Sequence, residues 1–135
     1  MFTLPAIPAA AKTSRVQLRY WLERLRWPAD QCHDIEAAVS EAVSNAVEHA
    51  YGPEVDGATV TVNAVLEVLP DRSRRVRASV ADYGRWRPVP GDLGHRRLGL
   101  RLMHGFADHV VINEGDGATG GTEVVLLSAP IPGEQ

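Results

Sequence analysis

Three polar residues spaced four apart could carry chemistry in this chain. Glu41, Asn45 and His49 lie in the segment Glu-Ala-Val-Ser-Asn-Ala-Val-Glu-His-Ala, which starts at position 41. Because side chains at i and i+4 share one face of a helix, a helix here would align a carboxylate, a carboxamide and an imidazole. Such a stripe could hold a metal-bound phosphate beside a base. It could equally be the solvated face of an ordinary helix.

A long amphipathic helix is predicted to position this stripe, from about Gln31 to Ala50. Asp30 is a suitable residue to cap its start. Its apolar residues recur at i, i+3, i+4 and i+7, so that the polar stripe borders the buried face. Small side chains would let the helix pack closely on a sheet. They stand at positions 38, 42, 46 and 50.

The remaining elements predict a two-layer α+β sandwich with a mostly antiparallel sheet and helices on one face. A short edge strand is expected to end at Pro5, and a first helix to run from about Ala10 to Arg26. Its expected apolar side is Val16, Leu18, Tyr20, Trp21, Leu22 and Leu25. Alternating apolar residues predict strands at 58–69, 75–81, 109–112 and 121–127. A further helix is predicted at 96–107. A loop is expected at 82–95 and a turn at 113–120.

Composition bounds what the protein can do. The chain has 135 residues and a net charge of −3, which argues against a direct nucleic-acid role based on phosphate neutralisation. Lys12 is the only lysine and lacks the glycines of a Walker-type phosphate loop, and Cys32 is the only cysteine. No apolar run reaches membrane-spanning length, so no membrane association is expected and a cytoplasmic location is the default. We expect one domain over 1–135, with about 128–135 as a tail or linker.

Three further segments are weak signals singly. The first is Asp-Tyr-Gly-Arg-Trp, which starts at Asp82 and follows a predicted strand. The second is a glycine-containing loop, Gly-His-Arg-Arg-Leu-Gly-Leu at 94–100, which leads into a helix where free backbone N–H groups could bind phosphate. The third is Gly-Gly-Thr at 120–122, which opens the last strand.

Together with the stripe, these segments resemble in order the N, G1, G2 and G3 boxes of the GHKL (histidine kinase-like) ATPase superfamily. The first box resembles most closely that of the bacterial anti-sigma-factor serine kinases, the RsbW and SpoIIAB type. Leu98 to Met103 and Gly121-Thr122 fit the later boxes. The resemblance extends over essentially the whole chain and implies the Bergerat-type ATPase fold.

The resemblance implies a role for each matching residue, with ATP and Mg²⁺ as cofactors. Asn45 would coordinate the Mg²⁺ that bridges the phosphates, and Glu41 would be the general base that acts on a serine hydroxyl. Asp82 would accept a hydrogen bond from the adenine amino group, and Gly84 would let the backbone approach the base. Gly99 and Leu100 would contact the phosphates, and Thr122 would support the adenine end.

The resemblance also implies partners: a sigma factor, a STAS-domain anti-anti-sigma protein, and a second copy in a homodimer. One segment departs from the pattern, because His95 and Arg97 stand where the G2 box has glycines. Glycine there permits positive φ and a close backbone approach. A nucleotide-binding module without phosphate transfer therefore stays an alternative, as does the kinase domain of a larger phosphatase–kinase regulator. His49 could pack or cap locally rather than touch a ligand.

Overall fold

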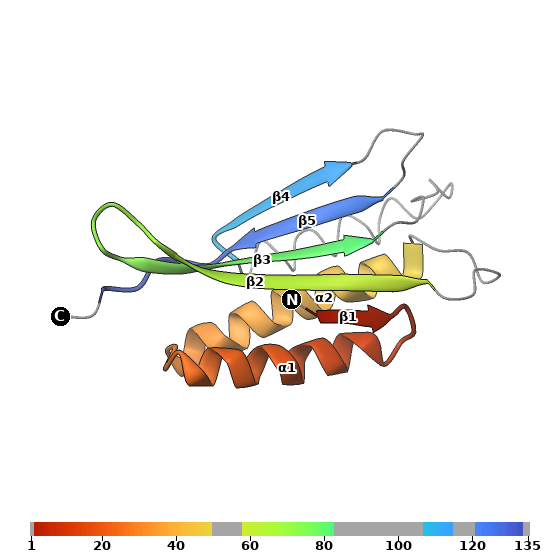
Figure 1. Ribbon diagram of the computed structural model, residues 1–135, viewed down its shortest axis with the longest axis horizontal. Coiled ribbons are helices and arrows are strands. Elements are labelled where there is room, and N and C mark those ends of the chain that lie inside the picture. Colours follow the sequence, from red (N-terminus) through yellow and green to blue (C-terminus); the bar gives the residue numbers. More distant parts are fainter. Residues whose placement is uncertain (1, 50–57, 83–106, 115–120, 134–135) are drawn as a thin grey trace.

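The computed structural model describes residues 2–49, 58–82, 107–114 and 121–133. They form one sheet of five strands with two helices (Figure 1). The elements in chain order are β1 (Phe2–Pro5), α1 (Ala10–Arg24), α2 (Ala29–His49), β2 (Thr59–Val68), β3 (Arg74–Asp82), β4 (His109–Glu114) and β5 (Thr122–Leu127). The strand order is β1-β2-β3-β5-β4, and every neighbouring pair is antiparallel. The predicted α+β sandwich is confirmed.

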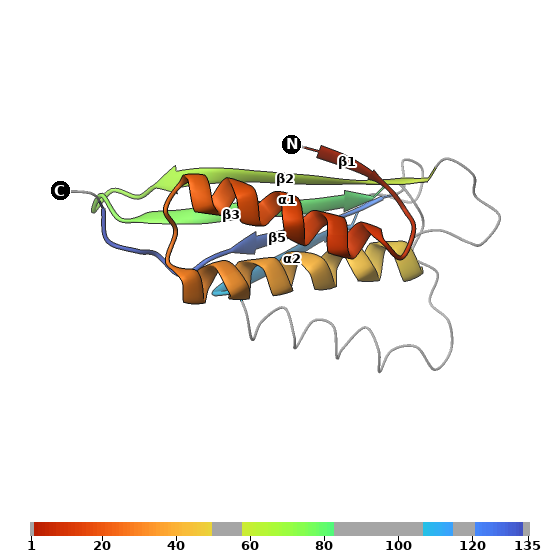
Figure 2. The same cartoon turned by 90° about the horizontal axis from the view of Figure 1, so that it is seen from below.

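Both helices lie on the same face of the sheet (Figure 2). The core between the layers is built from α2 and the inward residues of the central strands. As predicted, the small residues Ala38, Ala42 and Ala46 are buried, and so are the alternating residues Val76, Ala78 and Val80. Close packing of α2 on β3 follows from these small side chains, because they let the helix backbone approach the sheet.

The end of α1 is closed by a residue in the left-handed conformation, Arg26. The N–H of Arg26 bonds to the carbonyl of Glu23, and the N–H of Trp27 bonds to that of Leu22. Arg26 has φ 55°. This is the Schellman arrangement, in which glycine is the preferred residue at the left-handed position because it has no Cβ. The arginine therefore holds a conformation that glycine would adopt with less strain.

We expect Arg26→Gly to stabilise the protein by about 0.5–1 kcal/mol, since relief of the left-handed strain exceeds the added freedom of the unfolded chain. Urea denaturation measures the change. Arg24→Gly, which places glycine inside the last turn of α1, is the matched control and should destabilise by a similar amount. Equal effects of the two variants would contradict the strain at Arg26.

An ion pair with one exposed and one buried partner joins the two helices. Glu36 on α2 is 3% exposed, and its Oε1 accepts a hydrogen bond from Nε of Arg19 on α1 at 2.8 Å. The Arg19 guanidinium keeps most of its contact with water, because its side chain is 55% exposed, so its own desolvation costs little free energy. The Glu36 carboxylate, in contrast, depends on this partner, since a buried carboxylate without a counter-charge is strongly unfavourable.

Arg19→Met should lower the thermal denaturation midpoint by several degrees, because it leaves the buried Glu36 carboxylate without its counter-charge. The double variant Arg19→Met, Glu36→Met should recover most of the loss, because two apolar side chains can replace a buried pair at little cost. Calorimetry of both variants tests this. A double variant no more stable than the single one would show that the pair itself matters little.

The helix boundaries and faces differ in part from the predictions. α1 ends at Arg24 rather than Arg26, and α2 starts at Ala29, so that Asp30 lies inside the first turn. The first backbone hydrogen bond of α2 runs from the N–H of Cys32 to the carbonyl of Pro28. Pro28 is therefore the N-cap residue of the helix. Asp30 as the cap was wrong. It still stabilises the helix start, because a negative charge is favourable there.

The predicted apolar side of α1 was wrong for two residues. Leu18 and Leu22 are buried, whereas Val16 is 44% and Tyr20 is 67% exposed. At 100° per residue, positions 16 and 20 lie almost opposite Leu18 on the helix. Hydrophobic composition had grouped them with the core, but their angular position excludes them from it.

Several strand limits moved by one or two residues. β3 includes Asp82, which had been assigned to the loop, and β4 extends to Glu114 through part of the expected turn. Ala107 is buried but is not helical, so the predicted helix does not extend to it. The rest of that helix, the remaining loop at 83–95 and the rest of the turn lie outside the described residues.

The expected tail at 128–135 is contradicted over its first half. Ser128 exchanges hydrogen bonds with Val76, and the backbones of Ile131 and Arg74 bond to each other in both directions. Ile131 is buried at 8% exposure. Gly133 lies against the Arg72 carbonyl, which an added Cβ would overlap at 2.1 Å. Residues 128–133 therefore pack along the start of β3 as part of the fold.

Candidate functional site

Two predicted site residues meet across the sheet. Asp82 is the last residue of β3 and Thr122 is the first of β5, and the two are direct partners in the antiparallel register. Both are buried, at 4% and 6% exposure. Directly opposed residues of antiparallel strands lie close enough for their side chains to interact. Thus a carboxylate and a hydroxyl separated by 40 positions in the chain form one edge of a polar site.

Asn45 brings a buried carboxamide from the helical layer. The residue is 5% exposed, and α2 packs over β3. The His49 end of α2, the end of β3 and the start of β5 all lie at the same end of the molecule in both views (Figures 1 and 2). Within the described part of the chain, the Asn45 side chain has no hydrogen-bond partner. Buried amides normally have partners, so this one is available to a ligand.

Glu41 lies one turn before Asn45 on α2, half-buried. Burial raises the pKa of its carboxyl, and the nearby negative charge of Glu48 raises the pKa further. A carboxylate with a raised pKa accepts a proton more readily than an ordinary glutamate. Perturbed carboxyl groups next to polar ligand-binding residues are common in active sites.

The other predicted site residues lie outside the described ranges. They are Gly84, Gly99 and Leu100, together with the two substituted G2 positions, His95 and Arg97. His49 is the last residue of α2, and its side chain is likewise not described. Of the predicted site, the described residues therefore place Glu41, Asn45, Asp82 and Thr122.

Glu48 is a charged neighbour that the sequence reasoning missed. It lies seven positions after Glu41, and residues at i and i+7 share a helix face over two turns. That spacing could have identified it, but attention rested on the four-residue repeat that leads to His49. Its charge acts on Glu41, as the raised pKa of that carboxyl shows.

The described residues offer few protein ligands for a metal. Among residues 2–49, 58–82, 107–114 and 121–133, no group of three or more His, Cys, Asp or Glu side chains could hold a metal ion. A cation beside Asn45 would then take most of its ligands from water and substrate. Mg²⁺ bound to nucleotide phosphates is coordinated in that way.

None of the helices in the described ranges is long and apolar enough to cross a bilayer.

Comparison with known families decides the class of this fold. The family described as the histidine kinase-like ATPase domain matches residues 4–127. This chain belongs to that family. Both helices and the five strands fall almost entirely inside the matched region. The family assignment predicted from the four sequence boxes is confirmed.

Two curated proteins are similar to this chain over most of its length. The chain is 30% identical over 128 residues to the serine-protein kinase RsbW of Bacillus velezensis, covering 86% of this chain and 78% of the relative. It is 28% identical over 124 residues to the anti-sigma F factor of Clostridium acetobutylicum, covering 84% and 80%. The chain thus resembles kinases and anti-sigma factors of this family over most of its length.

A solved structure in the family supports the same fold. The RsbU and RsbW domains of a Mycobacterium tuberculosis protein match with a TM-score of 0.66 at 30% identity. The match covers 99% of this chain and 34% of the other. This chain therefore spans about a third of that solved chain, in which an RsbW domain is joined to an RsbU domain.

Proposed function

We propose that this protein is an ATP-dependent protein serine kinase that phosphorylates a STAS-type anti-anti-sigma protein and sequesters a sigma factor. One observation carries the proposal. Asn45, a buried carboxamide with no hydrogen-bond partner among the described residues, lies one turn from Glu41, a half-buried carboxyl of raised pKa, in a histidine kinase-like ATPase domain. The names of the relatives from Bacillus and Clostridium support the kinase and anti-sigma roles.

In the proposed mechanism, ATP lies at the end of the sheet where Asp82 and Thr122 meet. The buried Asp82 carboxylate accepts a hydrogen bond from the adenine amino group, and burial excludes water that would compete for it. The Asn45 amide oxygen would hold Mg²⁺, and the ion would supply positive charge that neutralises the phosphates. Gly84, Gly99 and Leu100 are assigned by resemblance to the adenine and phosphate contacts.

Glu41 is the proposed general base. It accepts the proton of the partner serine hydroxyl as that oxygen attacks the terminal phosphate, and ADP leaves. The raised pKa suits this role, because a base works best when its pKa approaches the working pH. Glu41 and Asn45 share a helix, so their separation is fixed by helix geometry rather than by a loop.

The test combines Mg-ATP, the protein and candidate STAS-domain proteins, with phosphoserine detected by mass spectrometry. We expect phosphate on a single serine of one STAS protein, and a mixed complex with a sigma factor in the absence of that protein. Mg-ATP binding by calorimetry is measured separately. Binding without transfer to any STAS protein would refute the kinase and leave an ATP-binding module.

That module is the rival function, and a specific feature of the chain favours it. His95 and Arg97 replace the glycines of the G2 box, so the phosphate loop has bulky side chains at positions where family members have none. A protein that holds nucleotide and a partner without transferring phosphate would tolerate this change. Single-turnover measurement with bound ATP separates the two functions.

The domain organisation of the Mycobacterium tuberculosis protein favours a further version of the proposal. There the RsbW domain shares a chain with an RsbU domain. The present sequence would then be the kinase domain of a larger phosphatase–kinase regulator. Reading the complete gene distinguishes this version from a stand-alone kinase. A homodimer is also proposed, which sedimentation at several concentrations would test.

A further inference from the structure

The sheet has a step at the edge formed by β1. Among the described residues, pairing between β1 and β2 extends as far as Phe2 opposite Val62, whereas β2 continues to Val68. Among the described residues, no strand pairs with Asn63–Val68 on that side. Unpaired backbone N–H and C=O groups at such an edge form a template for an added strand.

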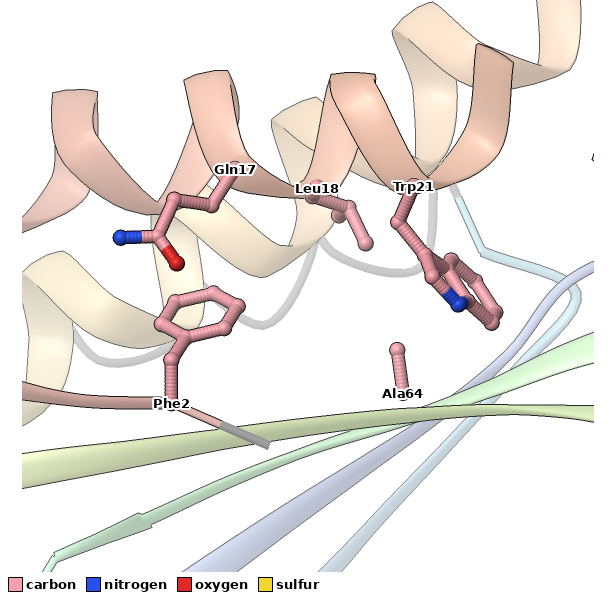
Figure 3. A pocket seen from close by; sticks show the side chains of 5 residues that line it. All are labelled: Phe2, Gln17, Leu18, Trp21 and Ala64. Carbon is pink, nitrogen blue, oxygen red and sulfur yellow. The ribbon is translucent and has the colours of Figure 1, made fainter. Parts of the chain in front are cut away.

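A cavity lies beside this step, between the sheet and α1. Its volume is ≈ 100 Å³, and it is lined by Phe2, Gln17, Leu18, Trp21 and Ala64. Figure 3 shows the Phe2 ring extending from β1 toward α1 and the Trp21 indole extending from α1 toward Ala64, with Leu18 between them. Apolar cavities of similar size accept small aromatic or aliphatic groups.

The cavity coincides with the next inward position of a strand in line with β1. Phe2 is opposite Val62, and both side chains face the helical layer. Because alternate residues of a strand share a face, a residue opposite Ala64 would face that layer too. Ala64 itself lines the cavity. An added strand would therefore place one side chain between the Phe2 and Trp21 rings.

Three arginines lie on the elements that border the step. Arg24 lies one turn after Trp21 on α1, Arg72 lies in the β2–β3 loop, and Arg77 is opposite Val65 on β3. All three arginines are exposed. An incoming segment with acidic residues would complement this charge, which contrasts with the net charge of −3 for the chain.

The same charge disfavours a second copy of this edge as the occupant. Among the described residues of β2 and the β2–β3 loop, Glu67 pairs with Arg75 at 3.0 Å, and Asp71 accepts hydrogen bonds from Ser73. Two copies would thus bring two sets of exposed arginines to one seam without matching free acids. Like charges across an interface reduce affinity.

We propose that an extended, acidic segment of a partner protein adds to the sheet along Asn63–Val68 and inserts one aliphatic or aromatic side chain into the cavity. Backbone hydrogen bonds would supply the common binding energy, and the cavity would select the residue. Exposed Val65, at 42%, adds apolar contact on the opposite face of the same strand. This docking does not depend on the proposed nucleotide chemistry.

The probes are three capped hexapeptides, Thr-Thr-Val-Glu-Xaa-Glu, with Leu, Phe or Met at the fifth position. When the peptide covers Asn63–Val68 antiparallel to β2, this position lies opposite Ala64 and the peptide stops short of β1. Amide hydrogen exchange of the full chain is measured with each peptide at up to about 1 mM. We expect at least one peptide to slow exchange at residues 63–68. A peptide with Ser at the fifth position should bind about tenfold more weakly or worse, because it leaves the cavity unfilled.

Two variants test the assignment independently. Ala64→Leu fills the cavity from within and should abolish peptide binding, and Arg77→Glu, on the opposite face of the sheet, should weaken it by about tenfold. Val111→Ala, on the exposed β4 edge, is the matched control and should leave binding unchanged. Because Arg77 is exposed, its variant keeps the test valid if Ala64→Leu fails to fold.

Three results would overturn the proposal. One is unchanged exchange at 63–68 with all three peptides. Another is peptide binding that persists unchanged in both Ala64→Leu and Arg77→Glu. The third is slow exchange at 63–68 without peptide that grows with protein concentration alongside a dimer mass, because the edge would then be occupied by a second copy.

Discussion

Glu41→Gln will reduce phosphoryl transfer to the partner protein by about 10²- to 10⁴-fold, the range that a positioned general base contributes. Mg-ATP affinity should change little, because Asn45 and Asp82 are untouched. The measurement is the initial rate of phosphoserine formation, with nucleotide affinity determined by calorimetry in parallel. Glu48→Gln is the matched control: it removes a neighbouring carboxylate from the same helix and should retain most of the activity.

The same variant should raise stability at neutral pH. Because the folded pKa of Glu41 is raised, the folded state holds this proton more tightly than the unfolded state. The stabilising contribution is complete below the ordinary glutamate pKa and is lost as the pH rises through the folded pKa. At pH 7 the charged carboxylate therefore costs stability, which glutamine removes. A variant that is inactive and also less stable would assign Glu41 to structure rather than to catalysis.

Asn45→Ala should weaken Mg-ATP binding by about 10- to 150-fold, the effect of losing one bond to a charged group, about 1.5–3 kcal/mol. The free protein should become slightly more stable, because alanine favours the helix and the buried amide had no partner in the described part of the chain. Calorimetric titration and urea denaturation measure the two effects.

Ser44→Ala is the control for this variant, since it changes the neighbouring residue on a different side of α2. It should leave Mg-ATP affinity unchanged. If Asn45→Ala bound Mg-ATP as tightly as the natural chain, Asn45 would not be a metal ligand. If both variants lost affinity equally, the effect would belong to the helix and not to the carboxamide.

The central helix could be predicted because its apolar pattern has no interruption over five turns. Its start could not, since Asp30 and Pro28 are both plausible at a helix beginning, and only the bond from Cys32 to Pro28 decides between them. Val16 and Tyr20 were misassigned because hydrophobicity was weighed before angular position. In both cases two local arrangements were acceptable from the sequence, and tertiary contacts selected the one that had not been predicted.

The candidate site was predictable as separate residues but not as an arrangement. Nothing local relates Asp82 to Thr122, because their proximity requires β5 to pair with β3 while β4 takes the outer position. The near-complete burial of Asn45 likewise depends on how closely α2 packs on β3. The four sequence boxes identified the members only through resemblance to proteins in which the pairing is already established.

The C-terminal segment was mistaken for a linker because proline and glycine surround its one large apolar residue, Ile131. Its pairing with Arg74 places Gly133 beside the β2–β3 loop, whereas Asp82 and Thr122 lie at the other end of β3 and β5 (Figure 1). A fluorophore or a biosensor chip coupled beyond Gly133 would therefore leave the proposed nucleotide site, at the Asp82 and Thr122 end, facing solution. Kinetic binding assays on immobilised protein should be anchored there.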